Sequence, residues 1–111
     1  MPELTPQQMK TVERLFAAGF RPIAIPPYEN ALCVRRGECI AVLTPVPHDG
    51  LRLLAPPSFL VAGNISVRLK RAQGEVFAWK RNEVDATMER LAELATFRQD
   101  LVEILEEASA P

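Results

Sequence analysis

Acidic side chains at helical spacing near the C-terminus are the first residues in this sequence that could perform chemistry. Glu89 and Glu93, Asp100 and Glu103, and Glu103 and Glu107 lie three or four positions apart. Neighbouring carboxylates can share a proton or a metal ion, which is the basis of paired-acid catalysis. These acids also form one continuous face of a helix whose opposite face is apolar, a pattern typical of a solvated helix surface. We interpret them as surface residues and predict no catalytic residue among them.

Two cysteines and one histidine are the remaining residues that could bind a metal or act as a nucleophile. Cys33, Cys39 and His48 are separated by five and eight residues, and this spacing matches no standard structural zinc site. A cysteine nucleophile needs a nearby base, whereas His48 lies in a proline-flanked loop nine positions after Cys39. The five glycines are scattered rather than gathered into a phosphate-binding loop. We predict no metal site, no cofactor and no enzymatic activity.

Basic and aromatic residues come together in one predicted β-hairpin, around residues 68–81. Its five cations form the candidate anion or nucleic-acid site: Arg68, Lys70, Arg71, Lys80 and Arg81. Basic residues beside exposed aromatic rings on a sheet hold single-stranded nucleic acid in several protein modules. Strand alternation places Arg68 and Lys70 on the solvated face, and we expect Phe77 and Trp79 on the core face. The aromatic and basic groups would then point apart, so nucleic-acid binding is the alternative function rather than the preferred one.

The elements that position these residues follow from the periodicity of the chain. Thr5, Pro6 and Gln8 have the spacing of a capped helix start, and Gly19 is a natural end for that helix. Short apolar or alternating runs then predict extended segments near 23–25, 31–35, 39–44, 51–54, 59–62, 65–70 and 75–81. A long helix should follow, from about Thr87 to Ala108. The predicted fold is α+β: an N-terminal helix, an antiparallel meander of four to six strands, and a long C-terminal amphipathic helix packed on one sheet face.

The terminal helix carries a wider apolar arc than one sheet face requires. An arc of about 100° suffices for a helix on a sheet, whereas this arc contains Leu91, Leu94, Ala95, Phe97, Leu101, Val102, Ile104, Leu105 and Ala108. A second surface should cover it, either the first helix or the same helix of a second copy in a two-fold dimer. The candidate interaction residues on this face are Leu94, Phe97, Arg98, Leu101, Ile104 and Leu105. Arg98 lies inside the arc, where its stem packs and its head reaches water or an acid of a partner.

The two cysteines flank a predicted turn at residues 35–37. A short loop there could bring Cys33 and Cys39 opposite each other across a hairpin, so a disulfide is geometrically conceivable. Residues 1–10 contain no apolar signal segment, and cytosolic disulfides are rare. We therefore expect two reduced thiols in a cytoplasmic protein. No apolar run approaches the roughly 20 residues that a helix needs to cross a bilayer, so the sequence predicts no membrane-spanning helix.

Size, composition and charge indicate one soluble domain over residues 1–111. The hydrophobic content of 48% and the charged content of 24% are those of an ordinary globular chain. A net charge of −1 conceals a segregation: residues 21–81 carry nine Lys and Arg against four Asp and Glu, and residues 82–111 carry two against eight. We predict a small non-catalytic interaction or regulatory module that forms a homodimer through the terminal helix or the sheet. A small-molecule-binding domain, with its pocket between sheet and helix, is a third class.

Overall fold

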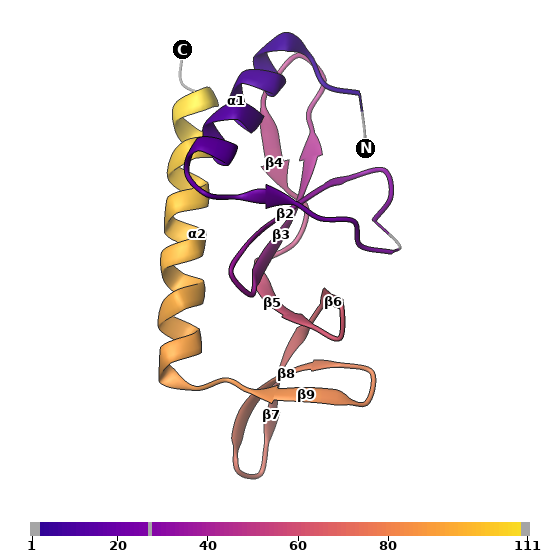
Figure 1. The fold of residues 1–111 in the computed structure, drawn as a ribbon, viewed down its shortest axis with the longest axis vertical. Coiled ribbons are helices and arrows are strands. Elements are labelled where there is room, and N and C mark those ends of the chain that lie inside the picture. The colour runs from indigo at the N-terminus through magenta and orange to yellow at the C-terminus, as the bar shows by residue number, and fades with distance from the viewer. Residues whose placement is uncertain (1–2, 27, 110–111) are drawn as a thin grey trace.

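The fold of this chain is α+β, with two helices and nine strands in the residues that the structure describes (Figure 1). The structure is a computed structural model that describes residues 3–26 and 28–109, with side chains up to residue 107. The elements are α1 (Pro6–Ala17), β1 (Arg21–Pro22), β2 (Leu32–Arg36), β3 (Cys39–Pro45), β4 (Leu51–Leu53), β5 (Ser58–Val61), β6 (Asn64–Ile65), β7 (Val67–Arg71), β8 (Gly74–Trp79), β9 (Asn82–Asp85) and α2 (Met88–Ser109). The predicted fold class and the order of helix, antiparallel strands and long terminal helix are confirmed.

The start of α1 is held by the residues that the sequence singles out. Thr5 Oγ1 accepts from the Gln8 N–H at 3.1 Å, and Gln8 Oε1 accepts from the Thr5 N–H at 2.9 Å. The Gln8 side-chain nitrogen also donates to the carbonyls of Val46, Asp49 and Gly50, at 3.1, 3.0 and 3.3 Å. Gln8 therefore caps the helix and fastens it to the loop between β3 and β4.

The first sheet has six strands, and β3 is its centre. β3 pairs with β2 along one edge, and β4 and β5 share its other edge: β4 pairs with Leu43–Pro45, and β5 pairs with Cys39 and Ile40. β1 pairs with β2 at one end of the sheet, and β6 pairs with β5 at the other. As expected for a central strand, β3 is apolar on both faces, and residues 39–43 are all fully buried.

The strands divide into two sheets where the sequence predicts a single run over residues 65–70. β7, β8 and β9 form a separate three-stranded antiparallel sheet. Ser66 lies between the sheets, and both its N–H and its Oγ donate to the carbonyl of Phe59, at 3.1 and 2.6 Å. The Ser58 hydroxyl lies 2.8 Å from that of Ser66. These buried bonds end β6 and redirect the chain, and strand alternation gives no sign of them.

The first sheet has apolar clusters on both faces. The larger cluster joins α1 and α2 to the sheet and contains Leu32, Val34 and Ala41 from β2 and β3. The smaller cluster, on the other face, is built around Ile25, Cys33, Ile40 and Val42, and neither helix of the described residues covers it. We call this second surface the helix-free face.

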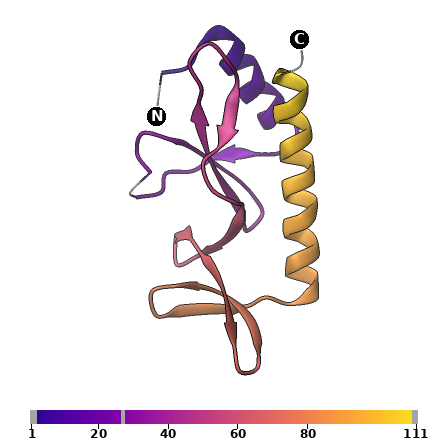
Figure 2. The same cartoon turned by 180° about the vertical axis from the view of Figure 1, so that it is seen from behind.

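The molecule is elongated, with extents of 47 × 26 × 19 Å and a radius of gyration of 14.4 Å, against about 13 Å for a compact chain of this length. Figures 1 and 2 show α2 running along one side, with α1 beside its C-terminal half. The three-stranded sheet lies at the end where α2 begins, and β5 contacts both β8 and β9. Neither helix is long and apolar enough to cross a membrane, over the residues searched.

Candidate functional site

Three of the six predicted interaction residues of α2 are buried in the interior of the protein. Phe97, Leu101 and Leu105 are buried in the larger cluster, between the helices and the sheet. Leu94 and Ile104 are half-buried and pack against the same cluster. The first helix, one of the two covers that the sequence allows, therefore lies over this arc, and the buried residues form no surface for a partner.

Arg98 differs from its neighbours because its side chain is exposed. It makes no ion pair with any residue in the described part of the chain. The structure thus places it at the solvated margin of the arc.

Arg36, which the sequence does not single out, links the hairpin of β2 and β3 to both helices. Its guanidinium lies 4.6 Å from the ring centroid of Phe20 and 5.9 Å from that of Phe97. It donates to Asp100 Oδ2 at 2.8 Å and to the carbonyl of Ala18 at 3.5 Å. These partners lie far from Arg36 in the sequence, so no local pattern signals the contact.

The cations of the predicted nucleic-acid site are dispersed and partly paired. Arg68 donates to both carboxylate oxygens of Glu75, and this hydrogen bond lowers the pKa of Glu75. Arg71 donates to Glu83 Oε1 at 2.8 and 2.6 Å. Lys80 Nζ lies 5.6 Å from the ring centroid of Trp79. Lys70 and Arg81 are exposed, and they make no ion pair within the described residues.

The predicted arrangement of aromatic and basic residues on opposite faces is wrong. Arg68 is the cross-strand partner of Phe77, so both side chains share one face of the three-stranded sheet. Phe77 is fully buried with its ring 4.9 Å from that of Phe59, whereas Val67, expected on the core side, is 56% exposed on the other face. Burial here depends on which positions lie over β5 and not on strand alternation. Phe77 offers no exposed ring on which a base could stack.

The cysteines lie on opposite faces of the first sheet, and both are free. Cys33 is opposite Val42, and Cys39 is opposite Arg36, so the register excludes the disulfide and agrees with reduced thiols. Burial raises the pKa of Cys33. Burial, together with the negative charge of Glu93, raises the pKa of Cys39 to about 12. Neither thiol is set up as a nucleophile, and no three His, Cys, Asp or Glu among the described residues are placed to hold a metal ion.

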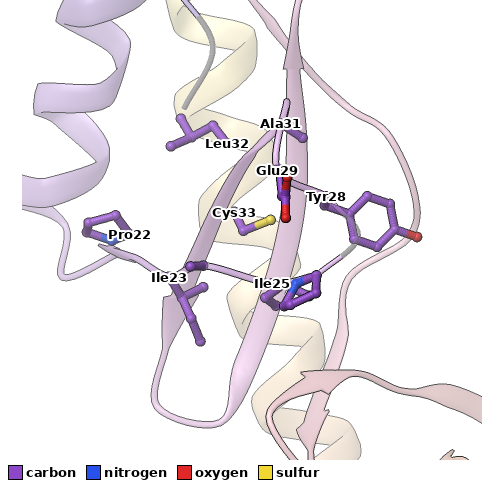
Figure 3. A pocket seen from close by; sticks show the side chains of 10 residues that line it. Pro22, Ile23, Ile25, Tyr28, Glu29, Ala31, Leu32 and Cys33 are labelled. Atoms are coloured by element: carbon purple, nitrogen blue, oxygen red, sulfur yellow. The ribbon is translucent and has the colours of Figure 1, made fainter.

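The helix-free face contains an apolar cavity of about 470 Å³ (Figure 3). Its walls are β1, the start of β2 and the described residues between them, 23–26 and 28–31, and it is lined by Pro22, Ile23, Ala24, Ile25, Pro26, Tyr28, Glu29, Ala31, Leu32 and Cys33. In Figure 3 the Cys33 side chain points to the side of β2 where Tyr28 and Glu29 lie, and Leu32 points to the other side. The sequence placed a pocket between sheet and helix, whereas this cavity lies on the face away from the helices.

Hydrogen bonds hold the wall of the cavity in place. The Ile23 N–H donates to the carbonyl of Cys33 at 3.0 Å, and the Tyr28 N–H donates to that of Ile25 at 2.7 Å. The Asn64 side chain, on β6, donates to the carbonyl of Pro26 at 2.9 Å. The wall is therefore tied to β2 at one end and to β6 at the other.

Comparison of this chain with protein-family models, with curated proteins and with solved structures finds no match.

Proposed function

We propose that this protein is a non-catalytic binding module that takes an apolar small molecule in the cavity of the helix-free face. The observation that carries the proposal is the apolar cavity itself, because its volume of about 470 Å³ falls in the range of small-molecule sites, roughly 300–1,000 Å³. Its lining is apolar apart from Tyr28 and Glu29. Apolar walls with a few polar groups are typical of such sites.

The edge of the sheet at this cavity favours a small molecule over an extended peptide. A peptide that adds a strand to a sheet is held by backbone hydrogen bonds from the edge. Pro22 and Pro26 lie on this wall, and proline has no backbone N–H to donate. Recognition here depends on filling the cavity rather than on pairing with the edge.

The chemistry of the lining supports binding rather than catalysis. Cys33 is the one thiol in the wall, and burial raises its pKa, so the reactive thiolate is disfavoured. The other polar lining groups are the Tyr28 hydroxyl and the Glu29 carboxylate. They include no second carboxylate or imidazole that would form a general acid and base pair.

The two other functions expected from the sequence have less support. Self-association through α2 was expected because its wide apolar arc needed a covering surface. Phe97, Leu101 and Leu105 of that arc are buried within one chain, so they do not require a second copy. For nucleic-acid binding, Phe77 offers no exposed ring, and Arg68 and Arg71 are engaged by acids of their own sheet. We do not include either in the proposed function.

A single spectroscopic probe tests the proposal, because Tyr28 is the only tyrosine in the chain. Protein labelled with 3-fluorotyrosine gives one ¹⁹F signal, in the wall of the cavity. Screening a set of apolar, ring-containing compounds should yield ligands that shift this signal in a saturable manner and raise the melting temperature, since a ligand of the folded state stabilises it.

The substitution Ala31→Phe should abolish these effects by filling the cavity, whereas Ala72→Phe, in the exposed turn between β7 and β8, should leave them unchanged. A screen in which no compound moves the Tyr28 signal would overturn the proposal. Binding that persists unchanged in Ala31→Phe would also overturn it, because the ligand would then occupy another place.

A further inference from the structure

We infer that the ligand of this cavity is a cationic amphiphile, an amine with a hydrocarbon or aromatic body. The inference rests on the proposed function and adds the charge of the ligand to it. It follows from the distribution of charged groups around an apolar wall.

Glu29 is the one charged residue among those that line the cavity. Its side chain is exposed, at the rim, and it forms no ion pair with any other residue of 3–26 or 28–107. An apolar body seated between Ile23, Ile25 and Cys33 could therefore direct a charged end toward this carboxylate. A cationic end would gain most from that placement, because it adds a charge attraction to any hydrogen bond.

The basic residues nearest to the cavity in the sequence, Arg21 and Arg35, are hydrogen-bonded to groups outside it. Arg21, beside Pro22, donates to the carbonyls of Phe16 and Phe20, at 2.8 and 3.0 Å, where α1 has just ended. Arg35 donates to the carbonyl of Gly37 at 2.8 Å and pairs with Glu38. Neither of these two cations is thus presented to a ligand at Glu29.

Tyr28 adds a second group that suits a cation. It is the one aromatic side chain of the lining, it is half-buried, and it lies beside Glu29 (Figure 3). The face of a phenol ring attracts ammonium groups within about 6 Å. A carboxylate and an aromatic ring at one side of an apolar cavity together favour an alkylammonium over a neutral or anionic end group.

Three probes with one body and different end groups test this inference: 3-phenylpropylamine, 3-phenylpropan-1-ol and 3-phenylpropanoate. Titration followed by the ¹⁹F signal of Tyr28 gives the dissociation constant of each. The amine should bind about three- to tenfold more tightly than the alcohol, from an exposed ion pair and a cation–π contact, and the carboxylate should bind most weakly. The preference should shrink as the salt concentration rises.

Substitutions then assign the preference to Glu29. Glu29→Gln should bring the amine and the alcohol to within twofold of each other, and Glu29→Ala should do the same. The matched control Glu38→Gln, an exposed carboxylate outside the cavity, should leave the preference intact.

The outcomes separate the two proposals. Equal binding of amine and alcohol to the unaltered protein, or tightest binding of the carboxylate, would overturn the inferred charge while leaving the cavity as a binding site. A preference for the amine that survives both Glu29 variants would also overturn the inferred role of Glu29. If no probe moves the Tyr28 signal and the wider screen also finds no ligand, both proposals are overturned.

Discussion

Arg36 on the hairpin of β2 and β3 and Asp100 on α2 lie 64 positions apart in the sequence, and they form a hydrogen-bonded ion pair of 2.8 Å. The same guanidinium lies over the ring of Phe20, which itself packs 5.2 Å from the ring of Phe97. One side chain thus joins the first sheet to the terminal helix through a charge and two aromatic rings. This contact ties the negative segment of the chain to the positive one within a single molecule.

Replacing Arg36 should destabilise the fold more than replacing the arginine next to it. Arg36→Ala loses the ion pair and the aromatic contact, and we expect the free energy of unfolding in urea to fall by about 1–3 kcal/mol. Arg36→Lys keeps the charge but lacks the planar fork, so it should recover only part of that loss. The control Arg35→Ala removes contacts only within its own turn and should change stability by about 0.5 kcal/mol or less. Equal effects of Arg35→Ala and Arg36→Ala would contradict the role assigned to Arg36.

The side-chain amide of Gln8 should be important for stability, because its nitrogen donates hydrogen bonds that a carboxylate cannot donate. Gln8→Glu would face three carbonyl oxygens with a group that only accepts hydrogen bonds, at a residue that is 2% exposed. We expect a loss of about 2–4 kcal/mol in the free energy of unfolding. The neighbouring substitution Gln7→Glu, on the exposed side of α1, adds the same charge without burying it and should be nearly neutral. A melting temperature unchanged by Gln8→Glu would show that these bonds contribute little.

The turn between β5 and β6 should accept a stabilising substitution. Ala62 and Gly63 connect the paired residues Val61 and Asn64 and have positive φ values of 50° and 76°. Asparagine adopts this backbone conformation more readily than alanine, and Asn-Gly is favoured in two-residue hairpin turns of this kind. Ala62→Asn should therefore raise the free energy of unfolding by about 0.5–1 kcal/mol.

The equivalent change at Ala72, in the two-residue turn between β7 and β8, is the control for that prediction. Ala72 is not among the residues with positive φ, so Ala72→Asn should give no gain in the same thermal or urea unfolding measurement. A gain of equal size at both turns would mean that backbone conformation is not the cause.

Stability should fall in alkali because Cys39 resists ionisation in the folded protein. Its pKa is raised from the usual 9.0 to about 12, so the unfolded chain releases the thiol proton at lower pH than the folded chain does. The stabilisation is fully present below pH 9 and is lost as the pH rises toward 12, by up to about 1.4 kcal/mol per pH unit. Urea unfolding over pH 8–11 should show this decline.

Removing the thiol should flatten that decline. Cys39→Ala lowers stability at every pH through the lost packing, but its stability should depend less steeply on pH above 9. Cys33→Ala, on the other face of the sheet, should keep the contribution of Cys39. An unchanged slope in Cys39→Ala would assign the alkaline decline to other groups.

Local patterns in the sequence determined both helices and the central strand of this fold, but not the short strands β1, β6 and β9. The capping box of Thr5 and Gln8, the end of α1 near Gly19 and the long helix from Met88 all depend on neighbours within one or two turns, so they can be predicted without a partner. The central place of β3 could also be predicted, because a strand that is apolar on both faces must be covered on both.

Tertiary structure alone decided how those elements meet, because each outcome depends on contacts between distant residues. The bonds of Ser66 to Phe59 divide the strands into two sheets, and the position of β5 buries Phe77 but leaves Arg68, its cross-strand partner, exposed. The pairing of Arg36 with Asp100, and the hydrogen bond from Asn64 to Pro26 at the wall of the cavity, likewise join segments that no periodicity relates. The wide apolar arc of α2 could be recognised from its spacing, but only the packing of α1 and the sheet against it showed that this chain covers much of that arc itself.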